Sequence, residues 1–170
     1  MDLGFVSRLW ITVAVSIVLI FIDQYFKGLI IFLEKGEFCI ISGFFSIIYR
    51  KNFAAAFSFF SCIPIEKRLI FLLISGFLSI LFFIFYLFKC QNLSLKQILC
   101  FNFIIGGAIS NLYDRWSLGY VVDFLDVYYK DWHWPTFNTA DTFIVVGIFG
   151  MLHESVILHG LVKKKACYWG

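Results

Sequence analysis

Two aspartates, Asp123 and Asp141, lie just outside long apolar stretches of the 170-residue chain. Asp123 follows the sequence GYVV, and Asp141 follows FNTA and opens a long apolar run. An ionisable group at a bilayer boundary is costly unless it is partnered, so its usual meaning is functional. Two carboxylates brought together share a proton, and one then acts as general base on water while the other acts as general acid. The pair therefore suits the hydrolysis of a peptide bond in the manner of aspartic proteases.

Helix termini suggest how the proton is shared. Asn138 or Thr139 is a natural N-cap, and either would put Asp141 in the first turn of a helix, where the macrodipole favours its anion. We therefore expect Asp141 to be ionised at rest and Asp123 to hold the proton.

Further polar residues interrupt the apolar segments. Asp23 and Lys27 are four residues apart, which places them on one helical face, either as a structural ion pair or in support of the site. Arg115 stays protonated and can anchor an acid or a substrate carbonyl. The candidate catalytic residues are Asp123 and Asp141, and the candidate supporting residues are Asp23, Lys27, Asn52, Asn111, Asp114, Arg115 and Asn138.

Small residues accompany this polar set on one segment. Gly106 and Ser110 form a pair with the spacing that permits close helix approach, and Gly107 and Asn111 repeat it beside them. Close packing alone would account for the glycines. It does not account for Asn111 and the charged residues that follow it.

Composition defines the elements that must position these residues. The chain is 61% hydrophobic and only 15% charged, whereas soluble domains average about 25% charged. Four segments, 9–33, 69–88, 95–113 and 140–162, are each apolar for about the 20 residues that a helix needs to cross a bilayer. The sequence thus predicts an α-helical membrane protein with four transmembrane helices in a single membrane domain, residues 1–170.

Charge density predicts the orientation. Basic residues crowd into the termini and the short link between the second and third spans, and are diluted over the two long connections, 34–68 and 114–139. Both termini should therefore be cytoplasmic, and both key aspartates should lie at the extracytoplasmic face. After a turn at Gly43, the first connection alternates like a small β-sheet, with Phe57 and Phe59 as further strand positions. The second connection is rich in Trp and Tyr and is expected to be an interfacial loop.

Several functional classes are disfavoured. A net charge of +3 without a long basic tract argues against nucleic-acid binding. The five cysteines show no CxxC spacing, which disfavours structural disulfides and zinc. His153 and His159 point to different helix faces, so the sequence HESVILH is not a zinc helix, and Glu154 is expected to pair or to extend toward the cytoplasmic side. No metal and no cofactor is expected.

Five motifs together resemble one family, the bacterial lipoprotein signal peptidases or signal peptidase II. They are DQYFK at 23–27, NFAAAFS at 52–58, GGAISNLYDR at 106–115, GYVVDF at 119–124 and FNTAD at 137–141. The resemblance covers most of the chain and is specific in this order. Ala54 and Ser110 depart from it, because the family usually has glycine at both positions.

The resemblance implies an aspartic endopeptidase of the bacterial cytoplasmic (inner) membrane. It implies prolipoprotein substrates whose lipobox cysteine already bears diacylglycerol, cleaved on the amino side of that cysteine. Asp123 and Asp141 match its catalytic pair, and the supporting residues named above match its recurring polar positions. Membrane lipids are the other expected partners, and the expected oligomeric state is a monomer.

Three alternatives remain. A small channel or proton-coupled transporter would also hold acids among apolar helices, but it should spread them across the bilayer. A non-catalytic scaffold or pseudoenzyme is the second alternative. A presenilin-type protease is disfavoured because the chain has no Gly-x-Gly-Asp motif.

Overall fold

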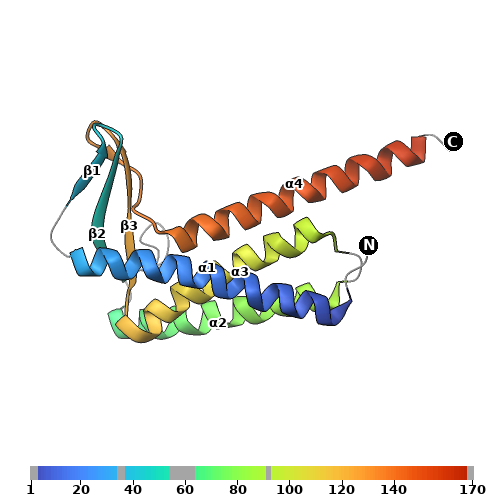
Figure 1. Ribbon diagram of the computed structural model, residues 1–170, viewed down its shortest axis with the longest axis horizontal. Coiled ribbons are helices and arrows are strands. Elements are labelled where there is room, and N and C mark those ends of the chain that lie inside the picture. The colour runs from blue at the N-terminus through green and yellow to red at the C-terminus, as the bar shows by residue number, and fades with distance from the viewer. Residues whose placement is uncertain (1–3, 34–36, 54–63, 91–92, 168–170) are drawn as a thin grey trace.

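The computed structural model describes residues 4–33, 37–53, 64–90 and 93–167. Four long helices form the body: α1 (Phe5–Leu33), α2 (Ile65–Lys89), α3 (Leu95–Leu118) and α4 (Thr139–Cys167). At one end they meet a small sheet whose strands run across the helix ends (Figure 1). The first turns of α1 and the last turns of α4 lie at the opposite end.

The third helix is the centre of the helical body. It packs against α1, α2 and α4, and more of its surface is buried than in α1 or α2. Ser94 and Gln97 form a capping box at its start, and Gly119 ends it with a φ of 81°. A left-handed residue at this place closes a helix without the strain that a Cβ would bring.

Within the described residues, three helices, α1, α2 and α3, are long and apolar enough to cross a membrane. Each predicted helix is present and is longer than expected, because polar residues at the ends remain helical. The difference that matters for the polar residues is in α3, which continues past residue 113 and includes Asp114 and Arg115. These two residues are therefore held by a helix and do not lie in a connection.

The sheet joins the two long connections. Its strands are β1 (Phe38–Ile41), β2 (Phe45–Asn52), β3 (Val121–Tyr129) and β4 (Trp132–His133), in that order and all antiparallel. The predicted turn at Gly43 is confirmed, with a φ of 76° between β1 and β2. Phe57 and Phe59 lie outside the described residues.

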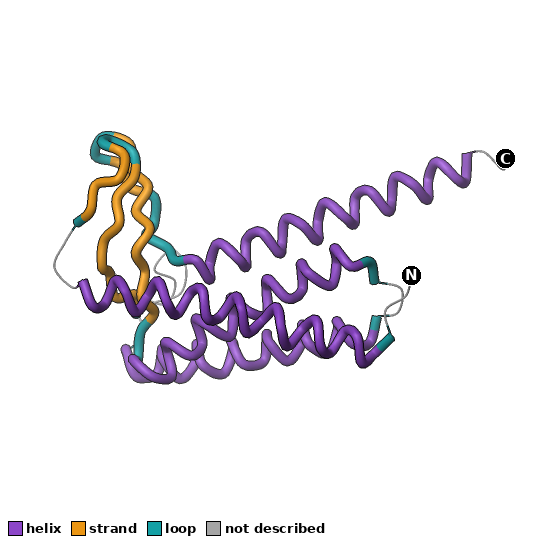
Figure 2. The backbone as a smooth tube through the Cα atoms, in the orientation of Figure 1, coloured by secondary structure: helices purple, strands orange, loops and turns teal. Residues whose placement is uncertain are grey.

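The sequence predicted that the second connection is an interfacial loop, but much of it is strand. It forms β3, which pairs with β2 along most of its length (Figure 2). The aromatic pattern was misleading because β3 is buried on both faces over residues 121–124, so polar and apolar residues do not alternate there. Asp123 is therefore a strand residue, which holds its carboxylate more rigidly than a loop would.

Glycines allow α3 to approach two other helices. A Cβ on Gly106 would lie 3.1 Å from the Cβ of Leu19 in α1. A Cβ on Gly107 would lie 2.5 Å from the carbonyl oxygen of Ala140 in α4. The predicted close packing is confirmed, and each glycine serves a different neighbour.

Candidate active site

Asp123 is held by two amide groups. Its side chain is almost fully buried, at 1% exposure. Asn52 of β2 donates from Nδ2 to Oδ2 at 2.8 Å, and Asn138 donates from Nδ2 to Oδ1 at 2.7 Å. Each carboxylate oxygen therefore accepts one hydrogen bond, and no described residue forms an ion pair with the group.

Asp141 lies in the first turn of α4, as predicted. The backbone N–H of Asp141 donates to Oδ1 of Asn138 at 2.8 Å, so Asn138 is the residue that caps the helix. Asn111 of α3 donates from Nδ2 to Oδ1 of Asp141 at 2.8 Å. The choice between Asn138 and Thr139 as N-cap is thus resolved.

Asn138 links the two acids. It is fully buried, and its Nδ2 group also lies 3.2 Å from Oδ1 of Asn111. The path from one carboxylate to the other therefore runs from Asp123 through the two asparagine amides to Asp141. This short chain of hydrogen bonds places both acids at one site, although they are 18 residues apart in sequence.

The environment of Asp123 disfavours its charge. Burial, and to a smaller extent the negative charge of Asp141, raise its pKa to about 7, although hydrogen bonds from Asn52 and Asn138 and the charge of Lys27 act in the opposite direction. A carboxyl group with a pKa near neutrality can give and take a proton at physiological pH.

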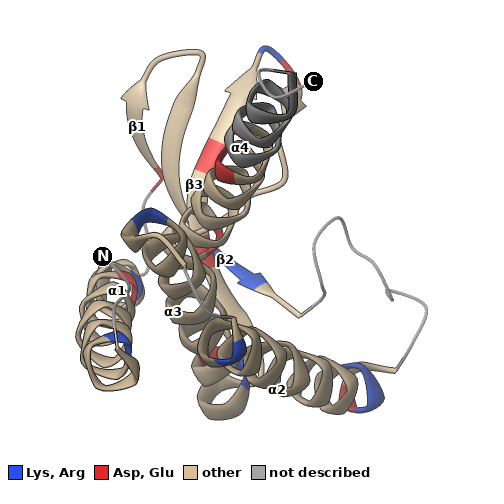
Figure 3. Cartoon of the chain, turned by 90° about the vertical axis from the view of Figure 1, so that its right-hand side faces the viewer, with Lys and Arg blue, Asp and Glu red and all other residues tan. Residues whose placement is uncertain are grey.

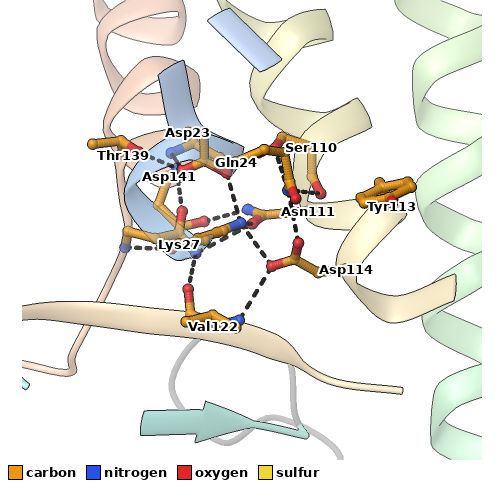
Figure 4. A network of polar contacts seen from close by, with 12 residues as sticks. Asp23, Gln24, Lys27, Ser110, Asn111, Tyr113, Asp114, Val122, Thr139 and Asp141 are labelled. Carbon is orange, nitrogen blue, oxygen red and sulfur yellow. Dashed lines mark hydrogen bonds and ion pairs between the residues drawn. The ribbon is translucent and has the colours of Figure 1, made fainter. Parts of the chain in front are cut away.

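A second group of charged residues lies directly behind the acids. Lys27 is 1% exposed, and its Nζ atom lies 2.7 Å from Asp23, 2.8 Å from Asp114 and 2.9 Å from Oδ1 of Asn111 (Figure 4). We call Asp23, Lys27 and Asp114 the lysine cluster. Because Asn111 bonds both Lys27 and Asp141, the cluster is connected to the site.

Asp23 connects α1 to the start of α4. Its Oδ1 atom accepts a hydrogen bond from the backbone N–H of Ala140 at 2.8 Å and another from the hydroxyl of Thr139. Its Oδ2 atom accepts from Ser110 at 2.7 Å. An anion at this end of α4 also interacts favourably with the helix dipole.

Asp114 connects α3 to the sheet. Gln24 donates to Oδ1 of Asp114 at 2.7 Å, and the backbone N–H of Val122 donates to Oδ2 at 3.2 Å. Val122 precedes Asp123, so this bond positions the strand that carries the acid.

The nine residues that the sequence singled out form one connected network. Arg115 joins it through Nη1, which donates to the carbonyl oxygen of Asn111 at 3.2 Å.

Sequence reasoning missed Gln24 and the hydroxyls of Ser110 and Thr139 as network members. Gln24 could have been found from its place beside Asp23 in an apolar segment. Ser110 stands where the family named in the sequence analysis usually has glycine. Its hydroxyl donates to Asp23 and accepts from Gln24.

A further pair was also missed. His133 Nδ1 lies 2.9 Å from Asp126, a buried acid on β3. Glu154, for which a partner was expected, lies 3.7 Å from the exposed Lys96. Among the side chains that the structure describes, no group of three or more His, Cys, Asp or Glu residues is placed to hold a metal ion.

Comparison with known proteins points to one family. The sequence profile described as signal peptidase (SPase) II matches residues 15–157. A lipoprotein signal peptidase of Teredinibacter turnerae is 37% identical over 145 residues, which cover 84% of each chain. One of Acinetobacter baumannii is 35% identical over 153 residues, which cover 89% of this chain and 85% of the relative.

The fold agrees with these sequence matches. A bacterial membrane enzyme solved at 2.3 Å resolution superposes with a TM-score of 0.76 over 85% of this chain and 87% of its own, at 24% identity. A second, solved at 1.9 Å, gives a TM-score of 0.73 over 84% and 90% of the two chains, also at 24% identity. With a family profile that spans most of the sequence and relatives that align along most of their length, the chain belongs to the signal peptidase II family.

Proposed function

We propose that Asp123 and Asp141 are the catalytic carboxylates of this enzyme, a membrane aspartic peptidase that removes signal peptides from prolipoproteins. The observation that carries the proposal is that Asn138 donates to both carboxylates, from Nδ2 to Asp123 and from its backbone N–H to Asp141, while the pKa of Asp123 is raised to about 7. Two acids held by amides, one of them protonated near neutral pH, are the requirement for general acid and base catalysis.

The mechanism follows from these environments. Asp141, at the positive end of α4, is the anion that takes a proton from water as the water attacks the peptide carbonyl. Asp123 supplies the proton that neutralises the developing oxyanion. When the C–N bond breaks, Asp141 gives the proton it took from water to the leaving amine, and the tetrahedral intermediate returns a proton to Asp123, so both acids regain their starting states. Asn52 and Asn138 hold Asp123 during these transfers, and Asn111 holds Asp141.

The proposed topology has four transmembrane helices with both termini in the cytoplasm. Three helices meet the length and apolarity that a span requires, and α4 runs beside α3 for much of its length. Charged residues gather at the helix ends and on the sheet, while the helix bodies are largely free of them (Figure 3). The site would then lie at the extracytoplasmic face of the bacterial inner membrane.

The sheet is proposed to rest at the lipid headgroups. Tyr129, Trp132 and Trp134 expose 66%, 59% and 46% of their surface. Such amphipathic aromatics favour the membrane interface. The interfacial role that the sequence suggested for a loop is thus assigned to the tip of the sheet.

The proposed substrate is a prolipoprotein whose cysteine carries diacylglycerol, cut on the amino side of that cysteine. α2 and α4 each pack on α3, and both expose large apolar side chains, including Phe82, Phe85 and Phe149. Acyl chains can therefore approach the site sideways from the membrane while the peptide reaches the acids at the boundary. We expect the enzyme to act as a monomer.

The lysine cluster is proposed to support the site. It fixes the start of α4 through Asp23, fixes β3 through Asp114, and orients Asn111 through Lys27. These three contacts set the positions of both catalytic acids.

One assay tests the proposal. Purified enzyme is incubated with a diacylglyceryl-modified prolipoprotein and with an unmodified copy. We expect cleavage of the modified substrate only, and no cleavage by Asp123→Asn or Asp141→Asn. Wild-type rates in either variant would exclude the catalytic assignment, and equal cleavage of both substrates would exclude the lipid requirement.

A further inference from the structure

A bulge in β2 brings an additional cation to the catalytic face of the sheet. Ile47 pairs with Leu125, yet Arg50 pairs with Asp123, so one extra residue has been inserted in β2 between them. Bulges of this kind redirect side chains and are frequent beside active sites. The insertion places Arg50 directly opposite Asp123, and the alternation of the strand then puts Asn52 on the same face.

The observed hydrogen bond of Asn52 to Asp123 supports this arrangement. Directly opposed residues of an antiparallel pair have Cα atoms about 4.5–5.5 Å apart. The guanidinium of Arg50 can therefore reach the space around the Asp123 carboxylate. Arg50 is exposed to solvent, whereas Asp123 opposite it is buried.

Most of the donors of Arg50 are still available. In the part of the chain that the structure describes, its one hydrogen bond runs from Nη1 to the hydroxyl of Thr136 at 3.0 Å. A guanidinium has five N–H donors and no acceptor. The bond to Thr136, which is only 9% exposed, aims the group along the face of the sheet and leaves the other donors free for a ligand.

We propose that Arg50 is a substrate-binding residue that donates hydrogen bonds to peptide carbonyl oxygens next to the scissile bond. The inference rests on the proposed catalytic role of Asp123. A peptide cut at Asp123 extends by about 3.3–3.6 Å per residue, so carbonyl groups near the cleaved bond pass within reach of the guanidinium. Hydrogen bonds from a charged donor to such carbonyls are stronger than those between neutral groups.

The neighbouring cation provides a matched control. Lys51 is also exposed, but it follows Arg50 directly and so lies on the other face of the sheet. Its Nζ atom lies 5.1 Å from the ring centroid of Tyr120 and 5.9 Å from that of Tyr49. Replacing Lys51 removes one positive charge from the same strand and leaves the face that carries Arg50 and Asp123 unchanged.

The test compares Arg50→Met, Lys51→Met and Thr136→Val with the modified prolipoprotein as substrate. We expect Arg50→Met to raise KM about tenfold or more, the usual loss for a hydrogen bond to a charged group, with kcat within about twofold. Arg50→Lys should restore part of the loss. Lys51→Met should leave KM near the wild-type value. Thr136→Val should raise KM by less than Arg50→Met does, because it removes only the hydrogen bond that orients the guanidinium.

Two results would overturn the inference. An unchanged KM in Arg50→Met would remove the substrate contact. An equal rise in KM for Thr136→Val would mean that Arg50 acts only by clamping the segment before α4. Direct binding of the uncut prolipoprotein to Asp141→Asn, with and without Arg50→Met, gives a second measurement in which we expect the Kd to rise by the same factor.

Failure of the catalytic proposal gives a different pattern. If Asp141→Asn still cleaves at the wild-type rate, the proposed function is wrong. If Asp141→Asn is inactive and Arg50→Met has a normal KM and a normal Kd, only the role of Arg50 is wrong.

Discussion

The lysine cluster and the proposed catalytic acids lie side by side, but their carboxylates have different kinds of partner. Asp23 and Asp114 each form an ion pair with Lys27 at less than 3 Å, and all three residues are at most 1% exposed. Among the described residues, Asp123 and Asp141 form no such ion pair, and asparagine amides are their hydrogen-bond partners. One group is neutralised by an opposite charge, and the other is only hydrogen-bonded.

This difference separates a structural role from a chemical one. An acid in direct contact with a buried ammonium stays ionised and is poorly suited to transfer protons. An acid held by amides keeps its geometry, while burial leaves its pKa free to rise toward neutrality, as that of Asp123 does. The ion pair expected of Asp23 and Lys27 is present. Their hydrogen bonds to Asn111 and to the start of α4 are the basis of the proposal that the pair also supports the site.

The largest expected effect is on catalysis. Asp123→Asn and Asp141→Asn should each lower kcat by about 10³-fold or more, since general acid and base groups contribute about 10²–10⁴-fold each. Both variants should unfold thermally within a few degrees of the wild type, because a neutral amide of the same shape replaces a buried acid. A large drop in unfolding temperature with either variant would mean that the acids also hold the fold.

Lys27→Met should act mainly on stability, whereas the aspartate variants act mainly on catalysis. Removing the ammonium leaves two buried carboxylates without a counter-charge, which typically costs about 3–5 kcal/mol. We expect a large fall in the unfolding temperature in detergent, measured by scanning fluorimetry, and a loss of activity that follows from it. Stability equal to that of the wild type would contradict the structural role of the cluster.

Helix packing behind the site provides a smaller effect. Gly107→Ala would place a Cβ 2.5 Å from the carbonyl oxygen of Ala140, at the start of the helix that carries Asp141. Overpacking of this kind costs about 1–3 kcal/mol. Gly28→Ala in α1 is the matched control, because no atom lies within 4 Å of the added Cβ. The two variants should differ in unfolding temperature, and equal values would show that α3 and α4 are not closely packed at Gly107.

The smallest expected effect is the dependence of the rate on pH. Because the pKa of Asp123 is raised to about 7, its proton is retained below that pH and lost above it. The rate should therefore fall as pH rises through about 7, to half of its maximum near that value. A rate that stays constant to pH 9 would contradict the assignment of Asp123 as the acid that holds the proton.

Much of the site could be predicted from the sequence. In an apolar chain each polar residue is conspicuous, so Asp23, Lys27, Asn111 and Asp114 were identified as candidates before their contacts were known. The i,i+4 spacing predicted the pair of Asp23 and Lys27, which the structure confirms. The ion pair of Lys27 with Asp114 could not be predicted, because it joins α1 and α3, whose rotation about their own axes depends on tertiary packing such as that of Gly106 on Leu19.

The sequence by itself determined the apolar helices, the turn at Gly43 and the identity of the polar residues, because these depend on local pattern and on the cost of polar groups near lipid. Only the tertiary structure decided that the second connection adds a strand beside the first, since pairing between distant segments leaves no local signal. That pairing, together with the cap of α4, brings Asn52, Asp123 and Asp141 to a common amide bridge. The same pairing contains the bulge that sets Arg50 opposite Asp123, because register is a property of two strands and not of one.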